Sequence, residues 1–153
     1  MFALLVYDIS SVSGLRCNQN NNILKGLTDM TKKVILAIDD NLMQLELFQK
    51  ALGGRYDVRP VKSASDAIHF LNIDQADIIL LDIEMPNISG FEFLTDIRKI
   101  PSYMDVPIII VSGNTGQSFF EKARSSSAFD VLTKPVSPEK LIETIEKAFA
   151  AAA

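Results

Sequence analysis

The chain has 153 residues, about the size of one ordinary domain, with 48% hydrophobic and 22% charged residues and a formal net charge of −4. This composition is too apolar for a disordered chain, and an acidic balance without a Lys/Arg cluster argues against direct nucleic-acid binding. The single cysteine, Cys17, and the single histidine, His69, exclude an internal disulfide and a His/Cys zinc site. We therefore expect one packed domain without a disulfide or a zinc site.

Residues 1–30 differ in composition from the rest of the chain. Their two basic and two acidic residues cancel, so the whole negative excess lies in the remainder. The apolar start is interrupted by Asp8 and follows no basic residue, which fits a signal peptide poorly, and no run is long enough to span a membrane. We expect residues 1–30 to be a flexible or non-native extension with Met30 as the natural start, followed by one domain over 31–150 and a tail over 151–153.

Short runs rich in Val, Ile and Leu alternate with longer segments throughout the rest of the chain. These runs predict strands at 34–38, 56–61, 78–82, 108–112 and 129–133. The run at 78–82 is apolar on successive residues, which is typical of a strand covered on both faces. Five repeats of strand and helix with short connections predict an α/β fold, a (βα)5 doubly wound parallel sheet with right-handed crossovers.

The segments between these runs have apolar residues three or four positions apart, the spacing of one helix face. In the first helix we expect Leu42, Leu45, Phe48 and Leu52 to form that face. Ser137, which Pro138 follows, is a favourable start for the last helix. The expected helices cover about 41–52, 63–71, a stretch around 91–97, 117–125 and the segment from 137 onward.

Charged and hydroxyl side chains follow the predicted strands where each one ends. Asp39 and Asp40, Asp82, Ser112 and Lys134 should therefore gather at one edge, where ligands of parallel sheets bind. Gathered carboxylates repel one another unless a cation compensates, and oxygen ligands without His or Cys suit Mg²⁺. The pattern predicts a Mg²⁺ and phosphoryl site in which Asp82 is best placed to attack phosphorus, with Lys134 and Ser112 contacting phosphoryl oxygens.

Each of these residues also has a simpler interpretation. Asp39 and Asp40 could only cap a helix, Ser112 could be a turn residue, and Lys134 could be a solvated charge. Their joint presence at successive strand ends favours a site. Two other phosphate chemistries fit less well: a haloacid-dehalogenase-like phosphatase needs a second Asp where Glu84 stands, and a flavodoxin-like FMN binder needs a hydroxyl-rich loop after the first strand.

Four motifs in this order resemble the response-regulator receiver domain, over about residues 32–149. They are 34–40 with its terminal acidic pair, 79–90 around Asp82, 107–113 with Ser112, and 132–135 with Lys134. The resemblance implies a flavodoxin-like strand order of 2-1-3-4-5. It also implies a switch that accepts a phosphoryl group on Asp82 from the phosphohistidine of a sensor histidine kinase or a histidine phosphotransfer protein.

The resemblance further implies roles for individual residues. The family's Mg²⁺ ligands correspond to Asp39, Asp40, Asp82 and the backbone carbonyl of Glu84. Ser112 matches the switch hydroxyl, and Lys134 matches the family's lysine, whose bond to the following proline is cis. We expect Mg²⁺-dependent phosphorylation and autodephosphorylation at Asp82, and no metabolic catalysis.

The implied output is contact with another protein. We expect no output domain after the fifth helix, so the signal would leave through the face formed by the fourth helix, the fifth strand and the fifth helix. A cytoplasmic protein without nucleic-acid contact or membrane insertion is expected. Genomic context, not sequence, would identify its pathway.

Two departures from the family pattern stand near the last strand. Val131 occupies the position three residues before Lys134, where many receivers have an aromatic switch residue, and Ser125–Ser127 replaces a frequent glycine. Glu84 and Asn114 occupy positions that tune phosphoryl-group lifetime in the family. Val131 leaves one alternative open, a pseudo-receiver that binds partners without being phosphorylated.

Overall fold

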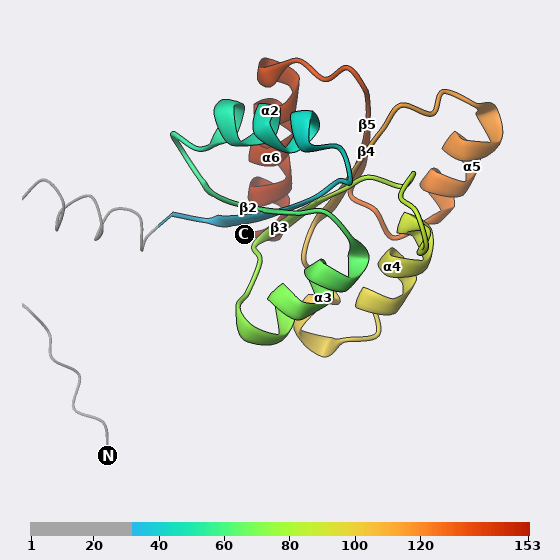
Figure 1. Cartoon of the computed structure of the whole chain (residues 1–153), viewed down its shortest axis with the longest axis horizontal. Coiled ribbons are helices and arrows are strands. Elements are labelled where there is room, and N and C mark those ends of the chain that lie inside the picture. The colour runs from blue at the N-terminus through green and yellow to red at the C-terminus, as the bar shows by residue number, and fades with distance from the viewer. Residues whose placement is uncertain (1–31) are drawn as a thin grey trace, which may run out of the picture. The chain divides into compact units, whose positions relative to one another are not determined.

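One five-stranded parallel sheet forms the centre of the computed structural model, which describes residues 32–153 (Figure 1). The strands are β1 (Val34–Ile38), β2 (Asp57–Val61), β3 (Ile78–Leu81), β4 (Ile108–Ser112) and β5 (Asp130–Thr133). Their order across the sheet is β2-β1-β3-β4-β5, and every neighbouring pair is parallel. The predicted fold and strand order are therefore confirmed, whereas the expected extension over 1–30 lies outside the described residues.

A helix follows each of the five strands, and side chains cap most of the helices' first turns. The helices are α2 (Leu42–Leu52), α3 (Ala64–Ile73), α4 (Gly90–Ile97), α5 (Gln117–Ser125) and α6 (Pro138–Ala152), with a short 3-10 helix η2 (Pro101–Tyr103) before β4. Asn41, Ser63, Ser89 and Ser137 each accept a hydrogen bond from a backbone amide in the first turn. Since Asn41 caps α2, Asp40 is not needed for that purpose.

The core lies on both faces of the sheet because alternate strand residues point to opposite sides. Helices α2 and α6 cover one face, where they meet Ile78 and Leu80 of β3. Helices α3, α4 and α5 cover the other face, where they meet Ile79 and Leu81 (Figure 1). All four β3 residues are fully buried, each contributing roughly 1.5–3 kcal/mol of hydrophobic stabilisation. This central strand is thus a rigid support for whatever follows Leu81.

Several details differ from the sequence predictions. Leu42 is 54% exposed, so the prediction that it joins the core face of the first helix was wrong. It is the first residue of α2, beyond the end of β1, and the buried stripe begins one turn later at Leu45. Strand β5 begins at Asp130, leaving Phe129 40% exposed, and η2 was not predicted. Within residues 32–153, no helix has the length and hydropathy needed to cross a bilayer.

Candidate functional site

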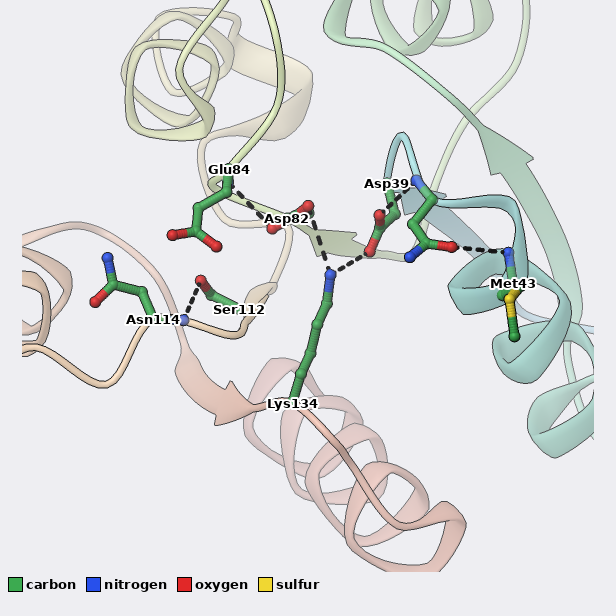
Figure 2. Close-up of polar contacts among 8 residues, drawn as sticks. Asp39, Met43, Asp82, Glu84, Ser112, Asn114 and Lys134 are labelled. Atoms are coloured by element: carbon green, nitrogen blue, oxygen red, sulfur yellow. Dashed lines mark hydrogen bonds and ion pairs between the residues drawn. The ribbon is translucent and has the colours of Figure 1, made fainter.

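The ends of four strands bring the predicted site residues to one edge of the sheet (Figure 2). Asp39 follows β1, Asp82 follows β3, Ser112 ends β4, and Lys134 follows β5. The Asp82 amide donates to the Ile38 carbonyl at 2.9 Å, and the Lys134 amide donates to the Ser112 carbonyl at 2.8 Å. Hydrogen bonding between the strands therefore continues into the site and holds the backbone of these residues.

The Lys134 ammonium lies between two buried carboxylates. Its Nζ is 2.6 Å from Oδ2 of Asp39 and 3.5 Å from Oδ2 of Asp82 (Figure 2). The side chains of Asp39 and Asp82 are only 1% and 4% exposed, and that of Lys134 is 21% exposed. Because buried like charges repel one another strongly, the shared ammonium offsets the repulsion between the two carboxylates.

Three carboxylates at this edge form a set of oxygen donors. Asp39, Asp40 and Asp82 each offer an oxygen, and these oxygens lie within 4.8 Å of one another. Asp40 is exposed, so the set opens to solvent on its side. The Glu84 amide donates to Oδ1 of Asp82 at 3.1 Å, which brings the Glu84 backbone beside that carboxylate. Hard oxygen donors with an open side fit a divalent cation that keeps some of its waters.

The pKa of Asp82 reflects competing influences. Burial is the largest influence, and the net result is a pKa raised from 3.8 to about 6. The hydrogen bond from the Glu84 amide and the charge of Lys134 lower it, while the Asp39 carboxylate adds to the rise. Asp82 is therefore ionised at neutral pH, yet its charge is poorly solvated, and a bound cation would relieve that burial cost.

The Ser112 hydroxyl anchors the loop that leads into α5. Ser112 is fully buried, and its Oγ accepts a hydrogen bond from the Asn114 amide at 3.2 Å (Figure 2). Oδ1 of Asn114 in turn accepts from the Gly116 amide at 2.9 Å, directly before α5. This link was not predicted, although an Asn two residues before a Gly is a signal for such a turn.

Glu84 stands at the solvent side of the same edge. Its carboxylate points toward the part of the site formed by Ser112 and Asn114 (Figure 2). A Cβ atom at Gly113 would lie 4.0 Å from Oε2 of Glu84, so this carboxylate borders the β4–α5 loop. Glu84 therefore adds negative charge at the entrance to the site.

The family model of the response regulator receiver domain matches residues 35–146, a range that includes the whole strand-end cluster. The chain belongs to this family. The solved chemotaxis response regulator CheY4 of Vibrio cholerae is 26% identical to it, with a TM-score of 0.72 over 77% of this chain and 99% of that one.

Curated relatives include both short and long proteins. The polar-differentiation response regulator DivK of Brucella ovis is 27% identical over 118 residues, covering 76% of this chain and 95% of that protein. A probable cyclic di-GMP phosphodiesterase of Vibrio cholerae is 26% identical over 90% of this chain but only 32% of its own length. The chain thus spans about a third of that longer relative.

The receiver domain keeps the expected peptide geometry but lacks the aromatic residue that the family often uses. The Lys134–Pro135 peptide bond is cis, as predicted. Val131 is half-buried and packs against the core beneath α3, α4 and α5, while Phe129 precedes β5. No aromatic side chain therefore occupies the position three residues before Lys134.

A glycine lets α4 of the receiver domain approach the end of β3. A Cβ atom at Gly90 would lie 2.6 Å from the carbonyl oxygen of Asp82 and 2.7 Å from Cα of Ile83. Either contact would force the backbone apart, so a larger residue does not fit. The Gly90 amide donates to the Ile83 carbonyl at 3.2 Å. This close approach holds the Asp82 backbone between the sheet and α4.

The unfolding free energy of the cation-free receiver domain should fall as pH rises from about 4 to about 7. Unfolded Asp82 ionises near 3.8 and folded Asp82 near 6, so between these values the folded state binds more protons. Ionising the buried Asp82 lowers the unfolding free energy by at most about 3 kcal/mol, and this loss is complete above the folded pKa. Asp82→Asn removes it, and the variant should therefore be the more stable protein at pH 8.

Urea unfolding of both proteins in EDTA across this pH range measures the effect. The difference between the two curves isolates Asp82 from the other acids. The exposed Asp66 supplies the matched control, because Asp66→Asn should give a difference curve without this slope. A difference that stays constant from pH 4 to pH 8 for Asp82→Asn would contradict the prediction.

Proposed function

We propose that this receiver domain is a phosphorylation switch of a two-component or phosphorelay system. In this proposal Asp82 accepts a phosphoryl group from the phosphohistidine of a sensor histidine kinase or a histidine phosphotransfer protein. The observation that carries it is the juxtaposition of a buried Asp82 carboxylate, the Lys134 ammonium and an open acidic edge. Family membership supports the same reaction.

The group transfer requires little covalent chemistry from the protein. An Asp82 oxygen attacks phosphorus, the phosphorus–nitrogen bond of the phosphohistidine breaks, and the departing imidazole takes up a proton. The product is an acyl phosphate on Asp82. Lys134 is close enough to Asp82 to neutralise one phosphoryl oxygen, and the Ser112 hydroxyl could donate a hydrogen bond to another.

Mg²⁺ is the cation that the site would hold. Its ligands would be Asp39, Asp40, Asp82 and the backbone carbonyl of Glu84. A bound Mg²⁺ would neutralise charge on the phosphoryl oxygens and orient the donor. The all-oxygen donor set and its open side support this assignment. Glu84 and Asn114, which border the site, would set how readily water reaches the acyl phosphate.

The β4–α5 loop would carry the signal outward. If Ser112 turns its hydroxyl toward a phosphoryl oxygen, the Asn114 amide loses its acceptor, and the turn before α5 is released. The face formed by α5, β5 and α6 would then repack and change its affinity for a downstream protein. Because Val131 stands where many receivers have an aromatic switch residue, the β4–α5 loop would be the main link between Asp82 and this face. A cytoplasmic location remains a prediction.

A pseudo-receiver is the second candidate, and Val131 is the residue that favours it. One experiment separates the two functions. The protein is incubated with a small acyl phosphate donor, with Mg²⁺ or with EDTA, and its intact mass is measured before and after mild base treatment. The phosphorylation switch gives a single base-labile adduct that requires Mg²⁺, together with Mg²⁺-dependent binding of beryllofluoride. Absence of both signals would leave the pseudo-receiver as the function.

A further inference from the structure

A cavity of about 360 Å³ lies between α4 and α5, along the length of α4 and beside the last turn of α5. None of the proposed phosphorylation-site residues lines it. The apolar wall is formed by Phe91 and Leu94, and the polar wall by Thr95, Ser125–Ser127 and two cations, Arg98 and Lys122. No acidic residue in the described part of the chain lines this cavity, so its charge is positive.

The Arg98 guanidinium is held in place by the backbone around the cavity. One terminal nitrogen donates to the carbonyls of Tyr103 and Val106, both at 2.7 Å. The other terminal nitrogen donates to the Ser127 carbonyl at 2.9 Å, and Nε donates to Ser127 Oγ at 3.1 Å. One N–H of the five is left over. The Arg98 charge and the Ser127 hydroxyl that it binds are therefore both held in fixed positions beside the cavity.

The second cation, Lys122, is held by an aromatic ring. Its Nζ lies 4.5 Å from the centroid of the Phe91 ring, a cation–π contact between α5 and α4. Phe91 also contacts Phe119, with ring centroids 6.0 Å apart, which keeps the two helices together beside the cavity. The ammonium is thus fixed at the cavity edge by a group that does not neutralise it.

Nearby acids do not pair with these two cations in the described structure. Asp96 and Glu92 line the neighbouring hollow that Lys122 also borders, but Asp96 pairs with Lys99 at 2.7 Å. Among residues 32–153 no ion pair involves Arg98 or Lys122. The Asp105 carboxylate acts on Arg98 through its charge without forming an ion pair with it. Neither cation is therefore paired with a carboxylate, and both can attract an anion that enters between the helices.

We propose that this cavity binds a small phosphate monoester. The phosphate dianion would meet the Lys122 ammonium, the remaining Arg98 N–H and the serine hydroxyls, which are the donors that phosphate oxygens prefer. The ester's organic group would lie against Phe91 and Leu94. A volume of about 360 Å³ exceeds what an inorganic ion fills and falls in the range of small-molecule sites.

The test titrates the ¹⁵N-labelled full chain with phenyl phosphate in EDTA buffer and follows the amide resonances. Saturable shifts are expected at Ser125–Ser127, with a dissociation constant on the order of 1 mM. Lys122→Gln should weaken binding about fivefold, because one unit charge near the phosphate is lost. The matched control is Lys99→Gln, which removes the same charge from an exposed position outside the cavity and should change binding less than about twofold.

Three outcomes would overturn the proposal. The first is no saturation up to about 10 mM phenyl phosphate. The second is equal weakening by Lys122→Gln and Lys99→Gln, which would indicate diffuse charge screening. The third is equally tight binding of uncharged phenol, which would show that phosphate is not recognised. The titration contains neither Mg²⁺ nor a phosphoryl donor, so its result does not depend on whether Asp82 is phosphorylated.

Discussion

Asp82→Asn is expected to abolish the phosphoryl adduct that the proposed switch would form with an acyl phosphate and Mg²⁺. The amide keeps the shape of the side chain and can still accept the hydrogen bond from the Glu84 amide. It is neither a nucleophile toward phosphorus nor an anionic metal ligand. Adduct formation, measured by intact mass over time, should fall by at least about a hundredfold.

The control for this loss is Asp66→Asn, which removes an exposed carboxylate from the first turn of α3. That variant should form the adduct at the rate of the unmodified protein. An adduct that persists in Asp82→Asn at full yield would place the acceptor on another residue. Asp39 and Asp40 would then be the next positions to replace.

Lys134→Met should have the second large effect, on both phosphorylation and stability. Without the ammonium, Asp39 and Asp82 remain as neighbouring buried carboxylates with no cation between them. In EDTA the free energy of unfolding should fall by about 3 kcal/mol, and adduct formation should slow by about a hundredfold because a phosphoryl oxygen loses its charged partner. Mg²⁺ should restore more stability to this variant than it adds to the unmodified protein.

Urea unfolding with EDTA and with Mg²⁺ measures these changes. Lys140→Met is the matched control, since Lys140 is exposed and pairs with Glu143 on the surface of α6. That variant should unfold like the unmodified protein in both buffers. If Lys134→Met also unfolds unchanged in EDTA, the ammonium does not stabilise the two carboxylates.

Much of this arrangement could be predicted from the sequence because buried parallel strands are visible as runs of Val, Ile and Leu. The topology then requires residues that follow those runs, such as Asp82 and Ser112, to share one edge. The distances between the side chains at this edge could not be predicted in the same way. Nothing in the sequence indicates that Lys134 lies closer to Asp39 than to Asp82, because that depends on the path of the backbone after β5.

Arg98 shows a second limit of sequence reasoning. Its guanidinium joins the end of α4 to the backbone carbonyls of Tyr103 and Val106 and to Ser127, which is 29 positions away. No local pattern predicts such contacts, because they follow from the course of two loops around η2. Leu42 is a related case: its spacing fits a core face, but the helix begins beyond the sheet that would cover it.

The position of β5 at the border of the sheet has an energetic consequence. This strand pairs only with β4, whereas β3 pairs with two strands and has four fully buried residues. Shifting β5 breaks one ladder of backbone hydrogen bonds, while shifting β3 would break two and expose the centre of the core. Lys134 therefore follows a border strand, which is cheaper to move than the central strand that Asp82 follows. In the proposed switch, the acceptor Asp82 would stay in place while Lys134 would move in response to the charge on Asp82.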